Sequence, residues 1–143
     1  MTKVDQTIFA TDPKRKGNCV SACVATHLGL SLSTVPHFIE HDREATVDGS
    51  TQSSTWWDML TGFMAAFGLW PVELTDPAEG EPKEILWVAG MSERGVLHQV
   101  LYRDGELWHD PHPSRAGVLD VREVLAWRLT LHDHTPTEDG DPR

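Results

Sequence analysis

The sequence has little cysteine and little continuous apolar length, and each shortage excludes a class of protein. Two cysteines in 143 residues exclude the disulfide framework of a small secreted domain. No apolar run approaches the roughly 20 residues that span a bilayer, and the first residues lack the apolar stretch of a signal peptide. We therefore expect a cytoplasmic protein without a membrane partner.

Basic residues are also few. Against 22 Asp and Glu stand 12 Lys and Arg, which gives a formal net charge of -10 at pH 7. This charge disfavours nucleic acid or an anionic membrane as the main partner. One basic run, at residues 14–16, breaks the pattern. Charge runs are most often solvated loops, but this run directly precedes a cysteine and would favour its negatively charged form.

The length fits one domain with a single core, which we place at residues 1–131, followed by a disordered acidic tail at residues 132–143. Apolar spacing and capping residues predict helices in the first half of the chain, and short apolar runs between turn residues predict strands in the second half. Helices followed by antiparallel strands indicate an α+β fold. The expected helices cover residues 18–29, 33–40, 54–68 and 120–127, and the expected strands cover residues 70–74, 85–89, 98–103, 107–109 and 128–131.

Two connections stand out between these elements. Asp104-Gly105 is the strongest short turn signal of the chain, and it predicts a hairpin. Residues 41–54 are polar and predict a long loop. Because loops of that length in a compact domain are often functional, this one is our candidate for a cleft wall or lid.

Cys19 is the best-placed residue for chemistry, because it opens a predicted helix. The positive end of the helix dipole and a nearby imidazolium both favour a thiolate, which is a nucleophile. The structural alternative is an inert buried cysteine. That alternative is favoured for Cys23, which lies one turn further along on the apolar face of the helix.

His98 and Asp110 complete a catalytic pattern. His98 opens a predicted strand and can act first as a base and then as an acid. Asp110 follows the next strand and can orient the imidazole ring. Each also has an ordinary explanation, as a histidine at a strand edge and as a turn residue before Pro111. Cysteine, histidine and acid in this order along the chain are typical of papain-like catalytic sites.

These motifs resemble the papain-like clan of cysteine peptidases. A Gly-Asn-Cys-x-x-Ala-Cys segment, a His-x-Val segment and a His-Asp-Pro-His-Pro segment look most like those of C39-type peptidase domains and of small C39-like proteins of bacteria and phages. The resemblance spans roughly residues 5–118 and rests on short motifs. It implies a papain-like fold, with N-terminal helices packed on an antiparallel sheet, and a peptide or protein substrate.

The chain departs from the C39 pattern at two positions. Those domains usually carry a glutamine six residues before the nucleophile to bind the oxyanion, and that position is Pro13 here. Those domains also commonly have a glycine directly after the nucleophile, and Val20 occupies that position here. Gln6 is the only upstream glutamine. It could reach the site if residues 10–17 loop out, and the backbone N–H of Cys19 would be the second donor.

Three further residues are candidates to contact substrate. Asn18 is the alternative oxyanion donor. Of the adjacent Trp56 and Trp57, only one can face the core squarely from a helix, so Trp56 is a candidate to line the cleft. Trp108 lies two residues before Asp110 and is the third candidate.

Other interpretations remain open. A metal site at His109, Asp110 and His112 is disfavoured, because neighbours on a strand point to opposite faces and no ligand spacing motif supports it; we expect neither a metal nor a cofactor. The same scaffold could bind a peptide or inhibit a partner without catalysis. It could also transfer an acyl group, as deamidases and transglutaminases do. The sequence favours a thiol-dependent hydrolase that cleaves a peptide, amide or isopeptide bond through an acyl-enzyme.

Overall fold

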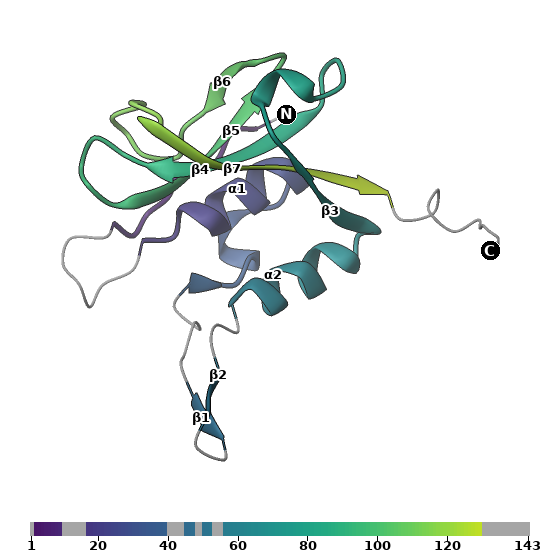
Figure 1. Cartoon of the computed structure of the whole chain (residues 1–143), viewed down its shortest axis with the longest axis vertical. Coiled ribbons are helices and arrows are strands. Elements are labelled where there is room, and N and C mark those ends of the chain that lie inside the picture. The colour runs from purple at the N-terminus through teal and green to yellow at the C-terminus, as the bar shows by residue number, and fades with distance from the viewer. Residues whose placement is uncertain (1, 10–16, 40–44, 48–49, 53–55, 130–143) are drawn as a thin grey trace, which may run out of the picture.

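The computed structural model describes residues 2–9, 17–39, 45–47, 50–52 and 56–129. Within these residues, two α-helices and a five-stranded sheet form the body of the molecule (Figure 1). The predicted α+β class is confirmed. The helices are α1 (Cys19–Leu28) and α2 (Trp56–Ala65), and the strands are β3 (Leu69–Leu74), β4 (Ile85–Met91), β5 (Leu97–Arg103), β6 (Glu106–His109) and β7 (Asp120–Leu129).

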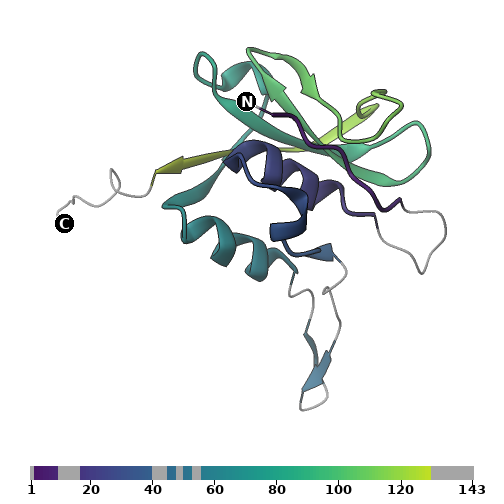
Figure 2. The same cartoon turned by 180° about the vertical axis from the view of Figure 1, so that it is seen from behind.

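The sheet is antiparallel throughout, with the strand order β3-β7-β4-β5-β6. Both helices lie on the same side of it, with α1 closer to the sheet than α2 (Figures 1 and 2). The core between helices and sheet includes Cys23, Val24, Leu60, Met64, Trp87, Leu101, Leu125 and Trp127. A second cluster, Leu86, Val88, Val100, Val124 and Ala126, covers the opposite face. The central strands are therefore buried on both faces.

The segment predicted as a helix at residues 120–127 is a strand instead. Of the separate strand predicted at residues 128–131, residues 128–129 are the end of the same element, and residues 130–131 lie outside the described residues. Val124 and Ala126 point into one core cluster, while Leu125 and Trp127 point into the other. The strand pairs with β3 on one side and β4 on the other. A short apolar run of this kind fits a buried helix or a buried strand equally well, and the pairing partners decided between them.

The helix predicted at residues 33–40 is also wrong. The described residues 33–39 contain no α-helix, and the 3-10 turn η1 (Leu32–Thr34) ends before Val35. Val35 adopts extended dihedral angles, with φ -106° and ψ 128°, because the ring of Pro36 disfavours helical angles at the residue before it.

The hairpin predicted at Asp104-Gly105 is confirmed. Both residues have positive φ, at 53° and 81°, which is the requirement of the type I′ turn that joins twisted antiparallel strands. A further turn, η3 (Pro77–Glu79), lies between β3 and β4. Local turn chemistry was thus sufficient to place the β5–β6 connection.

The segment predicted as a long loop at residues 41–54 contains two short strands, β1 (Ala45–Val47) and β2 (Ser50–Gln52), paired antiparallel. They project away from the sheet (Figures 1 and 2), and their role as a lid stays a prediction. The predicted tail at residues 132–143 and the basic run at residues 14–16 lie outside the described residues. Among the helices of the described chain, none is long and apolar enough to cross a membrane.

Candidate functional site

Cys19 is the first residue of α1, as predicted. The preceding Asn18 gives the helix no side-chain cap. Its carboxamide oxygen instead accepts the backbone N–H groups of Thr7 and Ile8, both at 2.9 Å, and its Nδ2 donates to Thr7 Oγ1 at 3.1 Å. The side chain therefore fixes the N-terminal segment to the start of α1. A contact between Asn18 and substrate stays a prediction.

The two cysteines lie one helical turn apart in different surroundings. Cys19 is half-buried, whereas Cys23 is fully buried. The Cys23 thiol donates to the carbonyl oxygen of Gln99 at 3.6 Å, and burial raises the pKa of this thiol well above its usual value. Only the thiolate is an effective nucleophile. Cys23 is accordingly an inert core residue, and Cys19 is the candidate nucleophile.

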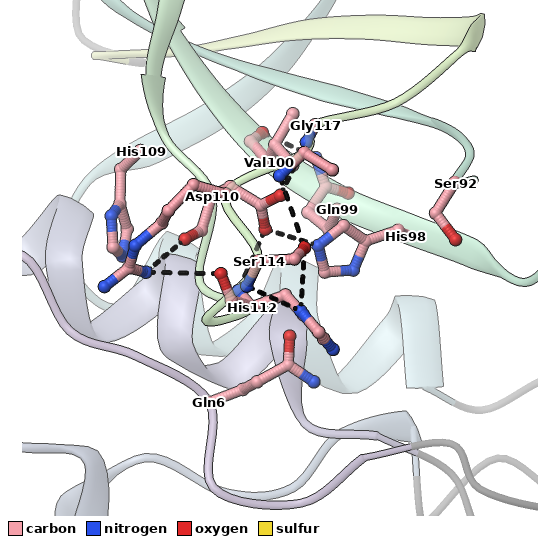
Figure 3. A network of polar contacts seen from close by, with 12 residues as sticks. Gln6, Ser92, His98, Gln99, Val100, His109, Asp110, His112, Ser114 and Gly117 are labelled. Atoms are coloured by element: carbon pink, nitrogen blue, oxygen red, sulfur yellow. Dashed lines mark hydrogen bonds and ion pairs between the residues drawn. The ribbon is translucent and has the colours of Figure 1, made fainter. Parts of the chain in front are cut away.

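The structure brings His98 and Asp110 into direct contact. The Nε2 atom of His98 lies 2.6 Å from Asp110 Oδ1, and the two residues are only 5% and 2% exposed (Figure 3). Asp110 Oδ1 also accepts the backbone N–H of His112 at 2.9 Å, and Oδ2 accepts that of Gly117 at 2.7 Å. Both carboxylate oxygens are therefore paired with donors.

These contacts set the charges of the pair. Burial opposes a charge on His98, but the hydrogen bonds with Asp110 and Cys19 outweigh it and raise the pKa of His98 to about 9. Burial likewise opposes a charge on Asp110, but the hydrogen bonds from His98 and from two backbone N–H groups lower its pKa to about 2. At neutral pH the pair is an imidazolium and a carboxylate.

Cys19 joins this pair through the other side of the histidine ring. His98 interacts with Cys19 both by hydrogen bonding and by charge. Since Nε2 is committed to Asp110, Nδ1 is the ring nitrogen left for the thiol. His98 and Asp110 are thus in direct contact, and the half-buried Cys19 lies close enough to His98 to raise the pKa of its ring.

Gln6 lies beside the start of α1, where a donor to an oxyanion is needed. Its Nε2 donates to the carbonyl oxygen of Ile8 at 3.0 Å, and the same oxygen accepts the backbone N–H of Asn18 at 3.1 Å. The Gln6 side chain is buried, and its Oε1 atom has no hydrogen-bond partner. Gln6 is thus linked through the Ile8 carbonyl to Asn18, the residue before Cys19. A direct role of Gln6 at the oxyanion stays a prediction.

A salt bridge connects the Gln6 segment to the Asp110 segment. Arg115 contacts both carboxylate oxygens of Asp5, at 2.6 and 2.7 Å, and also donates to the backbone carbonyl of Asp110 at 2.5 Å. The backbone N–H of Gln6 donates to the carbonyl of Pro111 at 3.1 Å. Residues as far as 110 positions apart in the sequence are thereby held together.

His112 is a neighbour of the site that sequence reasoning considered only as a metal ligand. Its ring lies edge-on to that of His98, with centroids 6.2 Å apart, and edge-on to that of Phe9, at 5.3 Å. Its backbone N–H donates to Asp110 Oδ1. The only sequence signal was its place two residues after the acid.

The two tryptophans predicted to bind substrate have other contacts in the structure. Trp56 is partly buried against the core and lies edge-on to Trp57, with centroids 5.8 Å apart. Trp108 lies under the ammonium of Lys3 at 4.9 Å and the guanidinium of Arg103 at 5.2 Å. Neither set of contacts includes Cys19 or His98, so both roles stay predictions.

The residues considered for a metal are separated by their hydrogen bonds. His109 is buried, with Nε2 2.7 Å from the carbonyl oxygen of Val4, whereas His112 faces Ser114. In the part of the chain that the structure describes, no group of three His, Cys, Asp or Glu side chains could hold a metal ion.

Comparisons with models of known families, with curated proteins and with solved structures found no match for this chain. A half-buried thiol on an uncapped helix N-terminus, an imidazolium and a buried carboxylate are the groups that nucleophilic acyl transfer requires.

Proposed function

We propose that this protein is a papain-like, thiol-dependent hydrolase that cleaves a peptide, amide or isopeptide bond through an acyl-enzyme at Cys19. The observation that carries the proposal is the 2.6 Å contact between His98 Nε2 and Asp110 Oδ1, on a ring that also interacts with Cys19. A merely structural histidine would not need a buried carboxylate on one side and a half-buried thiol on the other.

The first half of the reaction forms the acyl-enzyme. The Cys19 proton resides on His98, and the thiolate sulfur attacks the carbonyl carbon of the substrate to form a C–S bond. The carbonyl π electrons move to oxygen, and they return when the C–N bond breaks. The His98 imidazolium gives its proton to the leaving amine, while Asp110 holds the ring in place and stabilises its positive charge.

The second half releases the acid product. His98, now neutral, removes a proton from a water molecule that attacks the thioester carbon. The C–S bond then breaks and the sulfur leaves as a thiolate. Because His98 keeps the proton taken from water, the thiolate–imidazolium pair is restored. An amine in place of water would give acyl transfer, so access of water to the thioester decides between hydrolysis and transfer.

Both tetrahedral intermediates carry a negative oxygen that needs donors. The Nε2 group of Gln6 uses one hydrogen on Ile8 and has a second one to offer. The backbone N–H of Cys19 lies at the positive end of α1, which has no side-chain cap. We assign the oxyanion to these two donors.

The test is the rate at which iodoacetamide alkylates Cys19 between pH 5 and 10, read by mass spectrometry on the intact protein. A His98 imidazolium that persists to about pH 9 is the positive partner of the thiolate, which is the form of cysteine that iodoacetamide alkylates. We expect fast alkylation near neutral pH in the wild type, and a rate that follows an ordinary thiol in His98→Ala.

Cys23 provides the control inside the same molecule. Because it is fully buried, a folded protein takes up one alkyl group, and a second group reports unfolding. Fast alkylation would justify a screen of peptide and amide substrates. Slow alkylation in both proteins would contradict the proposal and favour a binding protein on a papain-like scaffold.

A further inference from the structure

The ring of His112 packs against two other rings at the candidate site. Its centroid lies 6.2 Å from that of His98 and 5.3 Å from that of Phe9, and both ring pairs are nearly perpendicular. Phe9 directly follows Ile8, whose carbonyl oxygen holds both the Gln6 amide and the Asn18 N–H at the start of α1. A substrate bound against Cys19 and His98 therefore lies near the His112 ring.

The hydrogen bonds of His112 determine which ring nitrogen carries its proton. The backbone N–H of Ser114 donates to Nδ1 of His112 at 3.0 Å, and the Ser114 hydroxyl lies 3.0 Å from the same atom (Figure 3). A nitrogen that accepts from an N–H has no proton of its own, so the proton of the neutral ring is on Nε2. No hydrogen bond within the described residues uses that Nε2 group.

The charges around the ring keep it neutral. Partial burial lowers the pKa of His112, and the positive charges of Arg94, His98 and Arg115 lower it further, against the opposite effect of Asp110. The two adjacent imidazoles thus differ: His98 is charged, and His112 is an uncharged donor. Adjacent titratable groups whose surroundings shift their pKa values in opposite directions typically have separate roles in a site.

We propose that His112 binds the substrate, its Nε2–H donating a hydrogen bond to a carbonyl oxygen of the acyl half. The inference rests on the proposed function and extends it. The ligand class is an acyl group with accessible carbonyl oxygens, such as a peptide. Gln6 and Cys19 provide donors on the helix side, and His112 provides one on the side of the β6–β7 loop.

The experiment compares two reactions of the same sulfur. Iodoacetamide alkylation displaces iodide and forms no oxyanion. Acylation by N-acetylglycine 4-nitrophenyl ester requires attack on a carbonyl carbon, loss of 4-nitrophenolate and formation of a thioester on Cys19. The variants are His112→Phe, which keeps an aromatic ring against His98 and Phe9, and His112→Gln, which keeps an N–H donor.

We expect His112→Phe to acylate about tenfold more slowly, the effect of one lost hydrogen bond of about 1.4 kcal/mol, with alkylation unchanged. His112→Gln should recover most of the acylation rate. Acylation of His112→Phe at the wild-type rate would overturn the inference, and so would an equal fall in both reactions, because that pattern marks a structural role at His98. Slow alkylation of the wild type would overturn the proposed function itself. The two failures are distinguishable, because alkylation is measured with iodoacetamide alone.

Discussion

The two sides of the candidate site differ in how completely their polar groups are paired. On the sheet wall, formed by His98 and Asp110, both carboxylate oxygens of Asp110 accept hydrogen bonds, and one of them holds His98. On the helix wall, formed by Gln6 and Cys19, the Nε2 group of Gln6 uses one of its two hydrogens on Ile8, and α1 begins without a side-chain cap. The difference separates two tasks. The base is held in one position, while the groups that meet the substrate keep hydrogen-bonding capacity for it.

Asp110→Asn should give the largest loss of stability, because it disturbs the hydrogen-bonded sheet wall. All the groups that contact this carboxylate are N–H donors. The NH2 group of asparagine, itself a donor, must therefore face another donor, either at Gly117 or on the side of His98 and His112. Breaking a buried, hydrogen-bonded ion pair costs about 3 kcal/mol or more. We expect a loss of that size in urea unfolding at pH 6, together with slower alkylation of Cys19 near neutral pH. Unchanged stability would mean that Asp110 is not charged in the folded protein.

Gln6→Met tests the other wall, where function should change more than stability. The variant removes the Nε2 donor, and loss of one oxyanion donor slows acyl transfer about 100-fold or more. The amide makes one side-chain hydrogen bond and leaves Oε1 unpaired, so the free energy of unfolding should change by less than about 1 kcal/mol. The measurements are acylation by an activated ester, urea unfolding and, as the control, alkylation by iodoacetamide, which should not change. Full acylation by Gln6→Met would remove this residue from the oxyanion site.

The pH dependence of stability should separate the two walls further. The pKa of His98 is raised to about 9, so the stabilisation that it gives is complete below its ordinary pKa of 6.5 and is lost as the pH rises through 9. The pKa of Asp110 is lowered to about 2, so its contribution is present above 3.8 and is lost as the pH falls through 2.

The stability difference between wild type and Asp110→Asn should therefore be greatest between about pH 4 and 6.5 and should shrink by on the order of 2 kcal/mol towards pH 9. The difference between wild type and Gln6→Met should be flat, since neither side chain titrates. Urea titrations of the three proteins at pH 5, 7 and 9 measure both quantities. A flat difference for Asp110→Asn would contradict the assigned charges.

Arg115→Ala should give the smallest effect. Arg115 bridges the two walls through Asp5, but the two side chains are 50% and 42% exposed, and exposed ion pairs contribute about 1 kcal/mol or less. We expect a loss of about 0.5–1 kcal/mol in urea unfolding. Arg122→Ala, which removes an exposed ion pair with Asp120 two residues away in the sequence, is the matched control and should change less. A larger loss for the control would mean that the bridge has no special role.

How far the sequence predicted the fold depends on how local each element is. The β5–β6 hairpin was predictable, because Asp104 and Gly105 provide the two positive φ angles within the turn itself. The strand β7 was not, because its nature is decided by β3, whose Leu74 pairs with Val124. Fifty positions of chain separate these partners, and no local pattern contains both.

The candidate site divides in the same way. Cys19, His98 and Asp110 were predicted as a site from their order and their local motifs. The structure places His98 against Asp110, and Cys19 affects the pKa of His98, while their catalytic roles stay predictions. The position of His112 could not be predicted, because it follows from the backbone of the turn after Asp110 and from the donor at Ser114. Residue type alone suggested a metal ligand there.

The place of β7 also has a consequence for the order of folding. β3 and β4 are joined by a short connection, yet each pairs with β7, which lies between them. The two strands must stay apart until residues 120–129 arrive. Because contacts between distant parts of a chain form slowly, we expect closure of the sheet to be a late event. The surface on which α1 rests is then completed last, and the thiol of Cys19 exists for a time without its finished surroundings.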